Sequence, residues 1–406
     1  MKEGWTYSTI GDLCDKMNGL WKGKIGPFVN VGVIRNANFT KSFTLSFDNI
    51  EYLDVEAKQY KTRKLQKGDL IVEKSGGSEK QPVGRTVLFD KEEGEYSFSN
   101  FTSVLRIKDR NVITPEFLYK YILFVYLRGD TRKMQKATTG IHNIEFDEFL
   151  SIPVPALSLS EQQSIVDYLD SAFAKIDAMK ANAEKALNEA KALFQASLKE
   201  MLEPKVGWNE TTLGDLVVSN IVGLTRGKAE QGYDKEYPYF KMNNISPDNT
   251  LCWDDLICVD ANKEELEKYS LQEGDFLFNT RNSKEWVGKS TVYRNYNTPV
   301  MLYNNNIMRI RFVDKINSVF VAYSFLADYT KDQLEKIKSG TTNVWAIYYR
   351  DLSKIILTYP SVIEQQSIVE SLDSLKSKVD RLQENFDKIS QECDALKQAI
   401  LRQVFE

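Results

Sequence analysis

The hexapeptide Glu-Gln-Gln-Ser-Ile-Val occurs twice in this chain, at residues 161–166 and at residues 364–369. A serine stands three residues before the glutamate of each copy. A Ser-x-x-Glu pattern is typical of a helix N-terminus, because each side chain can satisfy an amide of the first turn. The two copies are 203 residues apart, which is too long a period for a solenoid repeat. The sequence therefore predicts a duplicated module in which each copy opens a helix.

Each hexapeptide begins a heptad pattern, with apolar or small residues at alternating spacings of four and three. The predicted seams are Ile165, Leu169, Ala172, Ile176, Met179, Ala183, Ala186, Ala190, Leu193 and Ser197 in the first helix, and Ile368, Leu372, Leu375, Val379, Leu382, Phe386, Ile389, Cys393, Leu396 and Ile400 in the second. We expect helices over residues 159–202 and 362–405, each about 66 Å long. Small residues on one seam face large ones on the other, so a coiled coil is favoured over packing on the globular parts.

Composition narrows the class of protein. With 406 residues, of which 42% are hydrophobic, the chain can form two or three domains without disulfide bonds. Its four cysteines show no Cys-x-x-Cys spacing, and the single histidine, His142, argues against most zinc sites and His-based catalysis. Neither an 18-residue apolar run nor a signal-peptide pattern is present, so we expect a cytoplasmic protein that does not contact a membrane.

The net charge of −4 does not by itself favour nucleic-acid binding. However, the acidic excess lies on the two helical segments, whereas residues 1–156 and 204–360 are close to neutral. Local clusters of lysine and arginine on the globular segments could therefore still contact phosphates.

The two globular segments share short motifs in the same order. Each has a Gly-Trp near its start, then a Gly-Asp-Leu, then a Gly-Lys, and later a Leu-Gln-x-Gly-Asp turn before an apolar run. Short β-branched and aromatic runs predict strands, and one helical pattern occurs in each segment, near residues 114–127 and 317–335. Both segments are therefore predicted to be α+β domains.

The order of the segments predicts how the helices run. A compact domain commonly has neighbouring termini, so the second globular segment should bring the end of the first helix close to the start of the second. We predict an α+β fold with two homologous globular domains separated by two long antiparallel helices that form a coiled coil, with pseudo-two-fold symmetry. The expected boundaries are 1–157 and 204–360 for the globular domains, and 158–203 and 361–406 for the spacer helices.

This arrangement resembles the specificity subunit of a Type I restriction–modification enzyme over nearly the whole chain. The resemblance is carried by the paired Glu-Gln-Gln helices, the Gly-Trp and Gly-Asp-Leu starts, the Gly-Asp turns, and the proline-ending strands at Pro153, Pro155 and Pro360. It implies two target recognition domains, each of which reads one half of a bipartite site on double-stranded DNA. The two segments no longer align near 344–356, where the second carries extra residues.

The resemblance also implies partners. The helices are expected to dock two adenine-specific methyltransferase subunits, and the assembled enzyme is expected to recruit restriction subunits. The chain itself is expected to be non-catalytic and to bind no cofactor, with S-adenosylmethionine, ATP and magnesium held by the partner subunits. The sequence contains no adenine-methylase Asn-Pro-Pro-aromatic motif. The alternative is a non-catalytic coiled-coil adaptor with two ligand-binding heads.

Candidate DNA contacts are donor-bearing residues in loops that recur in both globular segments. Arginine suits guanine and asparagine suits adenine in the major groove, whereas other basic side chains position phosphates. The residues expected to contact DNA are Lys22, Lys24, Lys74, Ser75, Lys80, Arg85, His142, Arg226, Lys228, Asn279, Arg281, Asn282, Lys284, Lys289, Asn343 and Trp345. Any single one of them could instead be an ordinary surface residue or a turn former.

Two further patterns bear on function. The glutamine pairs Gln162-Gln163 and Gln365-Gln366 are predicted to bind partner subunits, although hydrogen bonds to backbone at the junction of head and helix would also explain them. Residues 283–290 resemble a phosphate-binding loop, but serine occupies the position of its first glycine. We therefore do not expect nucleotide binding at this loop.

Overall fold

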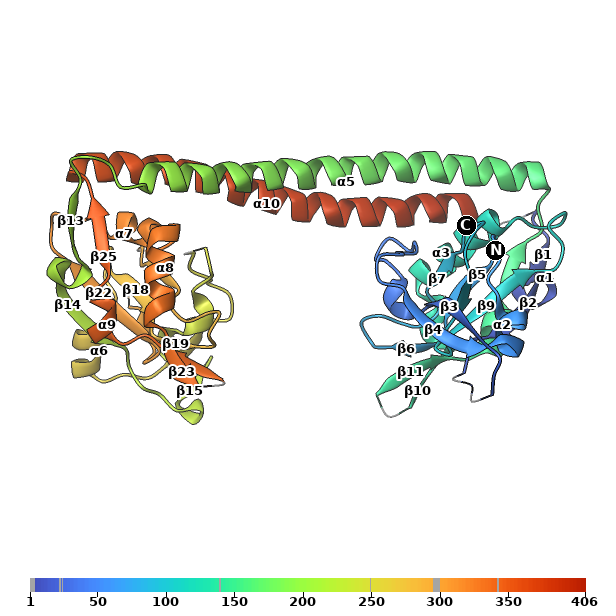
Figure 1. Cartoon of the computed structure of the whole chain (residues 1–406), viewed down its shortest axis with the longest axis horizontal. Coiled ribbons are helices and arrows are strands. Elements are labelled where there is room, and N and C mark those ends of the chain that lie inside the picture. The colour runs from blue at the N-terminus through green and yellow to red at the C-terminus, as the bar shows by residue number, and fades with distance from the viewer. Residues whose placement is uncertain are drawn as a thin grey trace. The chain divides into compact units, whose positions relative to one another are not determined.

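The computed structural model describes the chain with the exception of residues 1–3, 22, 24, 139, 249, 295–299 and 342. Contacts divide the chain into two compact units: Met1–Ala183 with Phe386–Glu406 form unit 1, and Glu184–Asn385 form unit 2. Each unit contains one globular head and a part of both long helices (Figure 1). We call the globular parts head 1 (residues 4–157) and head 2 (residues 204–360).

The two long helices begin and end where the heptad pattern predicts. Helix α5 spans Leu159–Leu202 and helix α10 spans Val362–Phe405, with 44 residues each. The N-terminus of α5 has both halves of the predicted capping box, since Ser158 N–H donates to Glu161 Oε2 (2.9 Å) and Glu161 N–H donates to Ser158 Oγ (3.4 Å). None of the helices in the described part of the chain is both long and apolar enough to cross a membrane.

The N-terminus of α10 differs in one detail from the predicted capping box. Glu364 N–H donates to Ser361 Oγ (3.4 Å), as expected. The Glu364 carboxylate, however, accepts a hydrogen bond from the indole Nε1 of Trp208 (3.3 Å). The tryptophan of the Gly-Trp motif thus ties the start of head 2 to the start of α10.

The two long helices pack antiparallel within unit 1. Lys397 Nζ of α10 lies 2.5 Å from Asp177 Oδ1 of α5, and Asp394 Oδ1 lies 3.7 Å from Lys180 Nζ. Residue numbers therefore rise along one helix as they fall along the other. The same two helices are joined in unit 2, where Lys191 Nζ donates to a side-chain oxygen of α10 (2.8 Å). The predicted pairing of two long antiparallel helices is confirmed.

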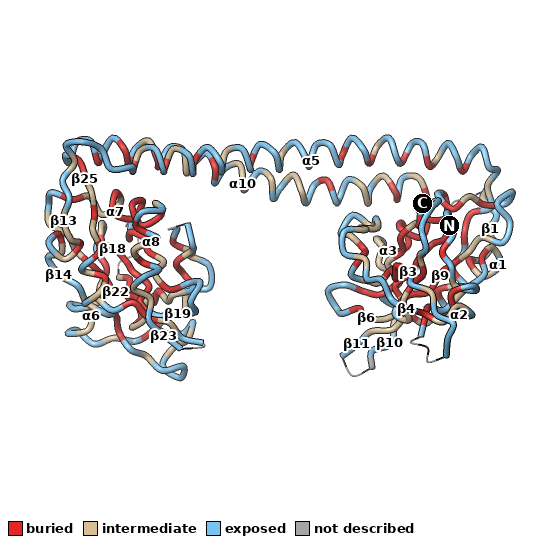
Figure 2. Tube along the Cα trace, in the orientation of Figure 1, coloured by how far each residue is buried: buried red, intermediate tan, exposed pale blue. Residues whose placement is uncertain are grey.

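The buried stripe of α5 differs in part from the predicted seam (Figure 2). Leu169 and Ile176 are buried as predicted, and Ala183, Ala190 and Ser197 are partly buried, but the alternate positions of the stripe lie one residue later than predicted. The buried residues at those positions are Val166, Phe173, Leu187 and Phe194, where Ile165, Ala172, Ala186 and Leu193 were expected. Large aromatic and leucine side chains bury more apolar area than alanine, so they decide which stripe faces inward. On α10 all predicted positions except Leu396 are at least partly buried.

Head 1 is an α+β domain of small sheets around one buried helix. Its strands pair in the orders β2-β9-β5-β7, β4-β3-β8, β10-β11-β6 and β1-β12. The strands are β1 (Tyr7–Thr9), β2 (Cys14–Asn18), β3 (Phe28–Ile34), β4 (Glu51–Glu56), β5 (Leu70–Glu73), β6 (Ser75–Gly77), β7 (Thr86–Leu88), β8 (Tyr96–Phe98), β9 (Thr102–Ile107), β10 (Gln135–Thr138), β11 (Ile141–Ile144) and β12 (Pro153–Pro155). The helices are α1 (Ile10–Leu13), η1 (Asn36–Asn38), α2 (Ala57–Arg63), α3 (Pro115–Arg128), η2 (Asp130–Met134) and α4 (Phe146–Leu150).

The core of unit 1 forms around α3, which matches the helical pattern expected near 114–127. Thr114 caps this helix by accepting the N–H of Phe117 (3.3 Å), and nearly every residue of the helix is buried. Phe405, at the end of α10, packs its ring against Phe117 (centroids 5.9 Å apart) and Tyr121 (5.2 Å). The last turn of α10 is therefore part of the core of unit 1.

Head 2 repeats this plan, with sheets in the orders β14-β22-β18-β20, β15-β17-β16-β21, β19-β24-β23 and β13-β25. The strands are β13 (Asn209–Thr212), β14 (Val217–Val222), β15 (Gln231–Gly232), β16 (Tyr237–Phe240), β17 (Ile257–Val259), β18 (Phe276–Asn279), β19 (Arg281–Asn282), β20 (Ser290–Val292), β21 (Leu302–Tyr303), β22 (Ile307–Phe312), β23 (Ser339–Thr341), β24 (Val344–Ala346) and β25 (Ile356–Tyr359). The helices are η3 (Leu213–Leu216), η4 (Lys228–Glu230), η5 (Met242–Asn244), α6 (Lys263–Tyr269), α7 (Ser318–Ser324), α8 (Asp328–Ile337) and α9 (Tyr349–Leu352).

The helical pattern expected near 317–335 is split into two helices, α7 and α8. Phe325 follows the last residue of α7, and its ring packs on Phe276 (5.3 Å) and Phe278 (6.0 Å) of the central sheet. Two residues later, Ala327 has an extended backbone (φ −73°, ψ 145°) and is the N-cap of α8, which begins at Asp328. The chain thus turns out of the helix just after the side chain that is anchored on the sheet.

The repeated Gly-Asp turns are structural. Gly68 has φ +94°, a conformation that glycine adopts readily, and the next residue, Asp69, is buried. The Asp69 carboxylate accepts two hydrogen bonds from the guanidinium of Arg106 (2.8 and 2.6 Å), as Asp275 does from Arg311 in head 2 (2.5 and 3.1 Å). The predicted turn followed by a buried strand is confirmed in both heads.

Candidate nucleic-acid interface

Each head brings its two candidate DNA-contacting loops together in one three-stranded sheet. In head 1, β6 pairs with the hairpin of β10 and β11, so that His142 lies opposite Gly77. In head 2, β19 pairs with the hairpin of β23 and β24, so that Arg281 lies opposite Ala346. Both sheets lie at the end of their head away from the long helices (Figure 1). Two loops that are far apart in the sequence therefore share one surface in each head.

The sheet of head 2 presents several donors to solvent. Arg281, Lys284 and Asn343 are exposed, and among the described residues the Arg281 guanidinium has no hydrogen-bond partner. Lys284 Nζ lies 5.0 Å from the centre of the half-buried Trp345 ring, which orients the ammonium group. These four residues remain candidates for direct contact with DNA.

The sheet of head 1 carries a different set of candidates. Lys80 is exposed in the turn after β6, and His142 is half-buried, with its Nδ1 3.4 Å from Gln135 Oε1. Ser75 and Lys74 are half-buried at the start of β6. Burial lowers the pKa of Lys74, and the nearby charge of Lys16 lowers it further. Lys80 is the most accessible of these cations.

The structure corrects the prediction for Arg85 and Lys289, which occupy equivalent positions in the two heads. Arg85 Nε donates to Glu73 Oε2 (2.6 Å), and both side chains are largely buried. Lys289 Nζ donates to the backbone carbonyls of Met242 (2.9 Å) and Ile245, and burial lowers its pKa. Both cations are used inside their heads, so neither is available to read a base.

Three further candidate DNA-contacting residues form hydrogen bonds within head 2. Asn279 is fully buried, and its side-chain amide donates to the carbonyls of Arg281 and Asn306 (both 3.0 Å). Its carbonyl oxygen accepts from Asn282 Nδ2 (3.0 Å), so these two asparagines shape the loop. The guanidinium of Arg226 donates to Glu265 Oε2 (2.7 Å). The predicted base contact is wrong for Asn279, because no part of its side chain reaches the surface.

The remaining predicted phosphate contacts are only partly described. Lys228 begins η4 and is exposed, so it stays a candidate. Lys22 and Lys24 lie outside the described residues. The resemblance of residues 283–290 to a phosphate-binding loop is superficial, because the segment leads into strand β20, whereas a phosphate-binding loop leads into a helix.

The first glutamine of each Glu-Gln-Gln motif joins a head to a long helix. Gln162 is 1% exposed; its Oε1 accepts the N–H of Thr114 (2.9 Å), and its Nε2 donates to the carbonyls of Val112 (2.8 Å) and Leu157 (2.9 Å). A buried side chain with these hydrogen bonds cannot also contact a partner, so the prediction of partner binding is corrected for Gln162.

Gln365 makes the same contacts in unit 2. It is 0% exposed, accepts the N–H of Asn317 (2.8 Å), and donates to the carbonyls of Lys315 (3.1 Å) and Pro360 (3.0 Å). The prediction of partner binding is therefore corrected for Gln365 as well. The second glutamines, Gln163 and Gln366, are exposed on the helices and stay predictions.

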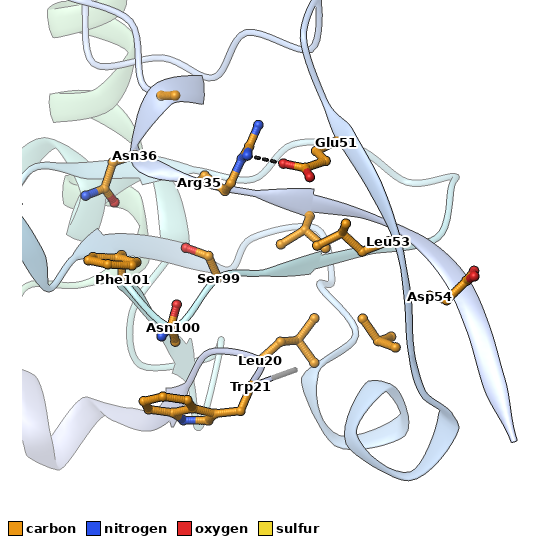
Figure 3. A pocket seen from close by; sticks show the side chains of 13 residues that line it. Leu20, Trp21, Arg35, Asn36, Glu51, Leu53, Asp54, Ser99, Asn100 and Phe101 are labelled. Carbon is orange, nitrogen blue, oxygen red and sulfur yellow. Dashed lines mark hydrogen bonds and ion pairs between the residues drawn. The ribbon is translucent and has the colours of Figure 1, made fainter. Parts of the chain in front are cut away.

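A pocket beside the sheet of head 1 was not expected from the sequence (Figure 3). Its volume is about 850 Å³. Its lining residues are Leu20, Trp21, Val33, Arg35, Asn36, Ala37, Glu51, Leu53, Asp54, Val55, Ser99, Asn100 and Phe101. The signal that could have pointed to it is the divergence between the heads at Trp21 and Phe101, where head 2 has Thr225 and Asn306.

Comparison with known proteins identifies the family. The model of the Type I restriction modification DNA specificity domain matches this chain twice, over residues 2–189 and 205–391. The chain belongs to this family. As a member with two such domains, it provides the DNA sequence specificity of a Type I restriction–modification system. This function is favoured over that of a coiled-coil adaptor.

Relatives match along the whole chain. The specificity subunit of the type I restriction enzyme StySPI from Salmonella potsdam is 23% identical over 100% of this chain and 89% of its own length. The EcoKI specificity subunit from Escherichia coli K12 is 22% identical with the same coverage.

Solved structures share the fold. A chain described with the complex assembly and conformational transition of the type I R-M system has a TM-score of 0.75 and 18% identity, covering 100% of this chain and 98% of that one. The HsdS subunit from Thermoanaerobacter tengcongensis has a TM-score of 0.54 and 18% identity, covering 100% of this chain and 97% of that one.

Proposed function

We propose that each head of this specificity chain reads one half of a bipartite sequence on double-stranded DNA. The observation that carries the proposal is the three-stranded sheet that recurs in both heads with different exposed donors. Head 2 presents the exposed Arg281, Lys284 and Asn343, whereas head 1 presents the exposed Lys80 and the half-buried His142. A common scaffold with different hydrogen-bonding side chains is what two unlike half-sites require.

The long helices are the proposed docking surface for two adenine-specific methyltransferase subunits. Both helices leave large apolar side chains exposed, and a docked partner would remove this apolar area from water. The exposed residues are Leu159, Tyr168, Met179 and Leu193 on α5, and Val362, Ile363 and Leu396 on α10. The exposed glutamines Gln163 and Gln366 lie on the same helices and complete the proposed surface.

In this proposal the chemistry belongs to the partners. The chain recognises the DNA sequence. The methyltransferase subunits bind S-adenosylmethionine and transfer the methyl group, and the restriction subunits bind ATP and magnesium. The chain itself is non-catalytic and works in the cytoplasm, where these subunits meet DNA.

Co-expression with an adenine methyltransferase subunit encoded beside it tests the proposal, with genome-wide mapping of methylated adenines as the measurement. We expect a new split motif that consists of two short specific blocks and an unspecific gap. Methylation at one continuous motif would show that the heads do not read separate half-sites. A soluble complex without any specific methylation would overturn the proposal.

A further inference from the structure

The pocket of head 1 combines aromatic walls with hydrogen-bonding groups. Trp21 is 65% exposed and Phe101 is 46% exposed, so both rings offer apolar surface to a ligand. In the view of Figure 3, Asn100 lies between these two rings. Arg35 and Asn36 enter from the end of β3, and Ser99 enters from the turn before β9.

Unsatisfied polar atoms are concentrated in this pocket. In the part of the chain that the structure describes, five buried side-chain polar atoms have no hydrogen-bond partner. Three of them belong to lining residues of this pocket, namely Arg35 Nε, Asn36 Oδ1 and Ser99 Oγ. A buried polar atom without a partner costs free energy, and these three atoms are themselves almost inaccessible to solvent. A ligand in the pocket therefore stabilises this lining when the three side chains turn toward it and pair with it.

The pocket is also joined directly to the strand that carries candidate DNA contacts. Asn36 Nδ2 donates to the Ser75 carbonyl (2.6 Å). The N–H groups of Lys74 and Ser75 both donate to the Phe101 carbonyl (2.9 and 3.1 Å). Two lining residues of the pocket therefore hold the first residue of β6, and a ligand in the pocket lies beside the proposed DNA-reading sheet.

The charges of the pocket argue against a phosphate group as its occupant. Its one guanidinium, that of Arg35, already forms an ion pair with Glu51, and Asp54 adds a second carboxylate. A phosphate would meet two negative groups and one neutralised cation. A flat neutral heterocycle suits the pocket better, because its faces can stack on aromatic rings while its edge completes hydrogen bonds.

Head 2 lacks these features at the equivalent positions. The β-bridge of Leu20 with Ser99 corresponds to that of Leu224 with Asn304, which places Thr225 at the position of Trp21. Met242 stands at the position of Asn36, and its carbonyl accepts a hydrogen bond from the partly buried Lys289. The aromatic walls are therefore special to head 1.

We propose that the pocket of head 1 binds a single nucleobase that is unstacked from the recognised DNA, with Trp21 and Phe101 as stacking surfaces and Asn36, Ser99 and Arg35 Nε as partners of its edge. The proposal rests on the proposed function, since it requires head 1 to bind duplex DNA. It assigns part of the half-site specificity to residues outside the three-stranded sheet.

The test uses the complex of the full chain with its methyltransferase partner and a duplex that carries the mapped motif. A mismatch is placed at each position of the head 1 half-site in turn, and the Kd is measured by fluorescence anisotropy. A mismatch removes the cost of unpairing an extruded base but disturbs a base pair that is read in place. We expect tighter binding at one position other than the methylated adenine, and weaker binding elsewhere.

The variants Trp21→Ala and Phe101→Ala test whether the base binds in the pocket of head 1. Both side chains are partly exposed, so the fold should tolerate the changes, and the loss of one stacking surface should weaken binding of matched DNA by about ten-fold. In these variants we expect that the mismatch no longer tightens DNA binding. Thr225→Ala, at the equivalent position of head 2, is the matched control and should keep both the affinity and the tightening.

The possible failures can be told apart. If wild-type complex methylates a split motif but no mismatch in this half-site tightens binding, the pocket proposal is overturned while the proposed function stands. If Trp21→Ala and Phe101→Ala instead weaken assembly with the methyltransferase in the absence of DNA, the pocket binds polypeptide and the proposal is wrong. Ser99→Ala, which removes an unpartnered hydroxyl, should leave thermal stability unchanged or higher and weaken only DNA binding.

Discussion

The backbone N–H of Thr114 donates a 2.9 Å hydrogen bond to the side chain of Gln162, and so links the start of α3 in head 1 to the first turn of α5. In unit 2, Asn317 and Gln365 make the same contact at 2.8 Å. Each pair lies 203 residues from its counterpart, so the duplication preserves the contact as well as the sequence. The glutamine of the repeated hexapeptide therefore fixes a head to a helix.

Replacing this glutamine should destabilise unit 1. Gln162→Ala leaves the N–H of Thr114 and two backbone carbonyls without partners in a buried place, which should cost about 2–4 kcal/mol of unfolding free energy. Urea denaturation followed by circular dichroism measures the change. The exposed neighbour provides the control, since Gln163→Ala should change the free energy by less than about 0.5 kcal/mol. Equal effects of the two variants would contradict the assigned role.

Two leucines of α5 test which stripe of the helix faces inward. Leu187 is 3% exposed and Leu193 is 57% exposed, and both belong to unit 2. Leu187→Ala should lower the unfolding free energy by about 2–5 kcal/mol, because it opens a cavity in a packed seam. Leu193→Ala makes the same chemical change on the surface and should have little effect on folding. A larger effect of Leu193→Ala on the isolated chain would restore the originally predicted seam.

Arg281 tests the DNA surface of head 2. Arg281→Ala should weaken binding of one half-site by about 1–3 kcal/mol and relax its sequence, if the guanidinium reads a base. The methylated motif and the methylation rate of the complex are the measurements. Arg350 is a matched control, since it is an exposed arginine of the same head that pairs with Asp351 instead of facing the sheet. If the motif and rate stay those of wild type in Arg281→Ala, the residue does not contact DNA.

Arg85 should affect stability and not sequence specificity. Its ion pair with Glu73 is largely buried, so Arg85→Ala leaves a carboxylate without its partner and should cost about 3–5 kcal/mol. The thermal midpoint of the chain should fall, and the double variant with Glu73→Gln should recover part of the loss. Lys80→Ala, a nearby exposed cation, should leave the midpoint unchanged. A changed methylation motif in an Arg85→Lys variant of normal stability would return Arg85 to the DNA-contacting set.

The sequence by itself determined the duplicated plan and both long helices. The bounds 159–202 and 362–405 were predicted correctly, because capping residues and heptad spacing act over a few neighbouring residues. The α+β nature of the heads and the turns at Gly68 and Gly274 follow from equally local signals.

Only the tertiary structure decided which donors are free. Arg85, Lys289 and Asn279 look like surface readers in the sequence, but their partners come from other segments: Glu73, Met242 and Asn306. A hydrogen bond between distant residues leaves no local pattern, and burial depends on everything that packs around a side chain. The pocket of head 1 has the same origin, because its walls come from four separate stretches of the chain that meet only on folding.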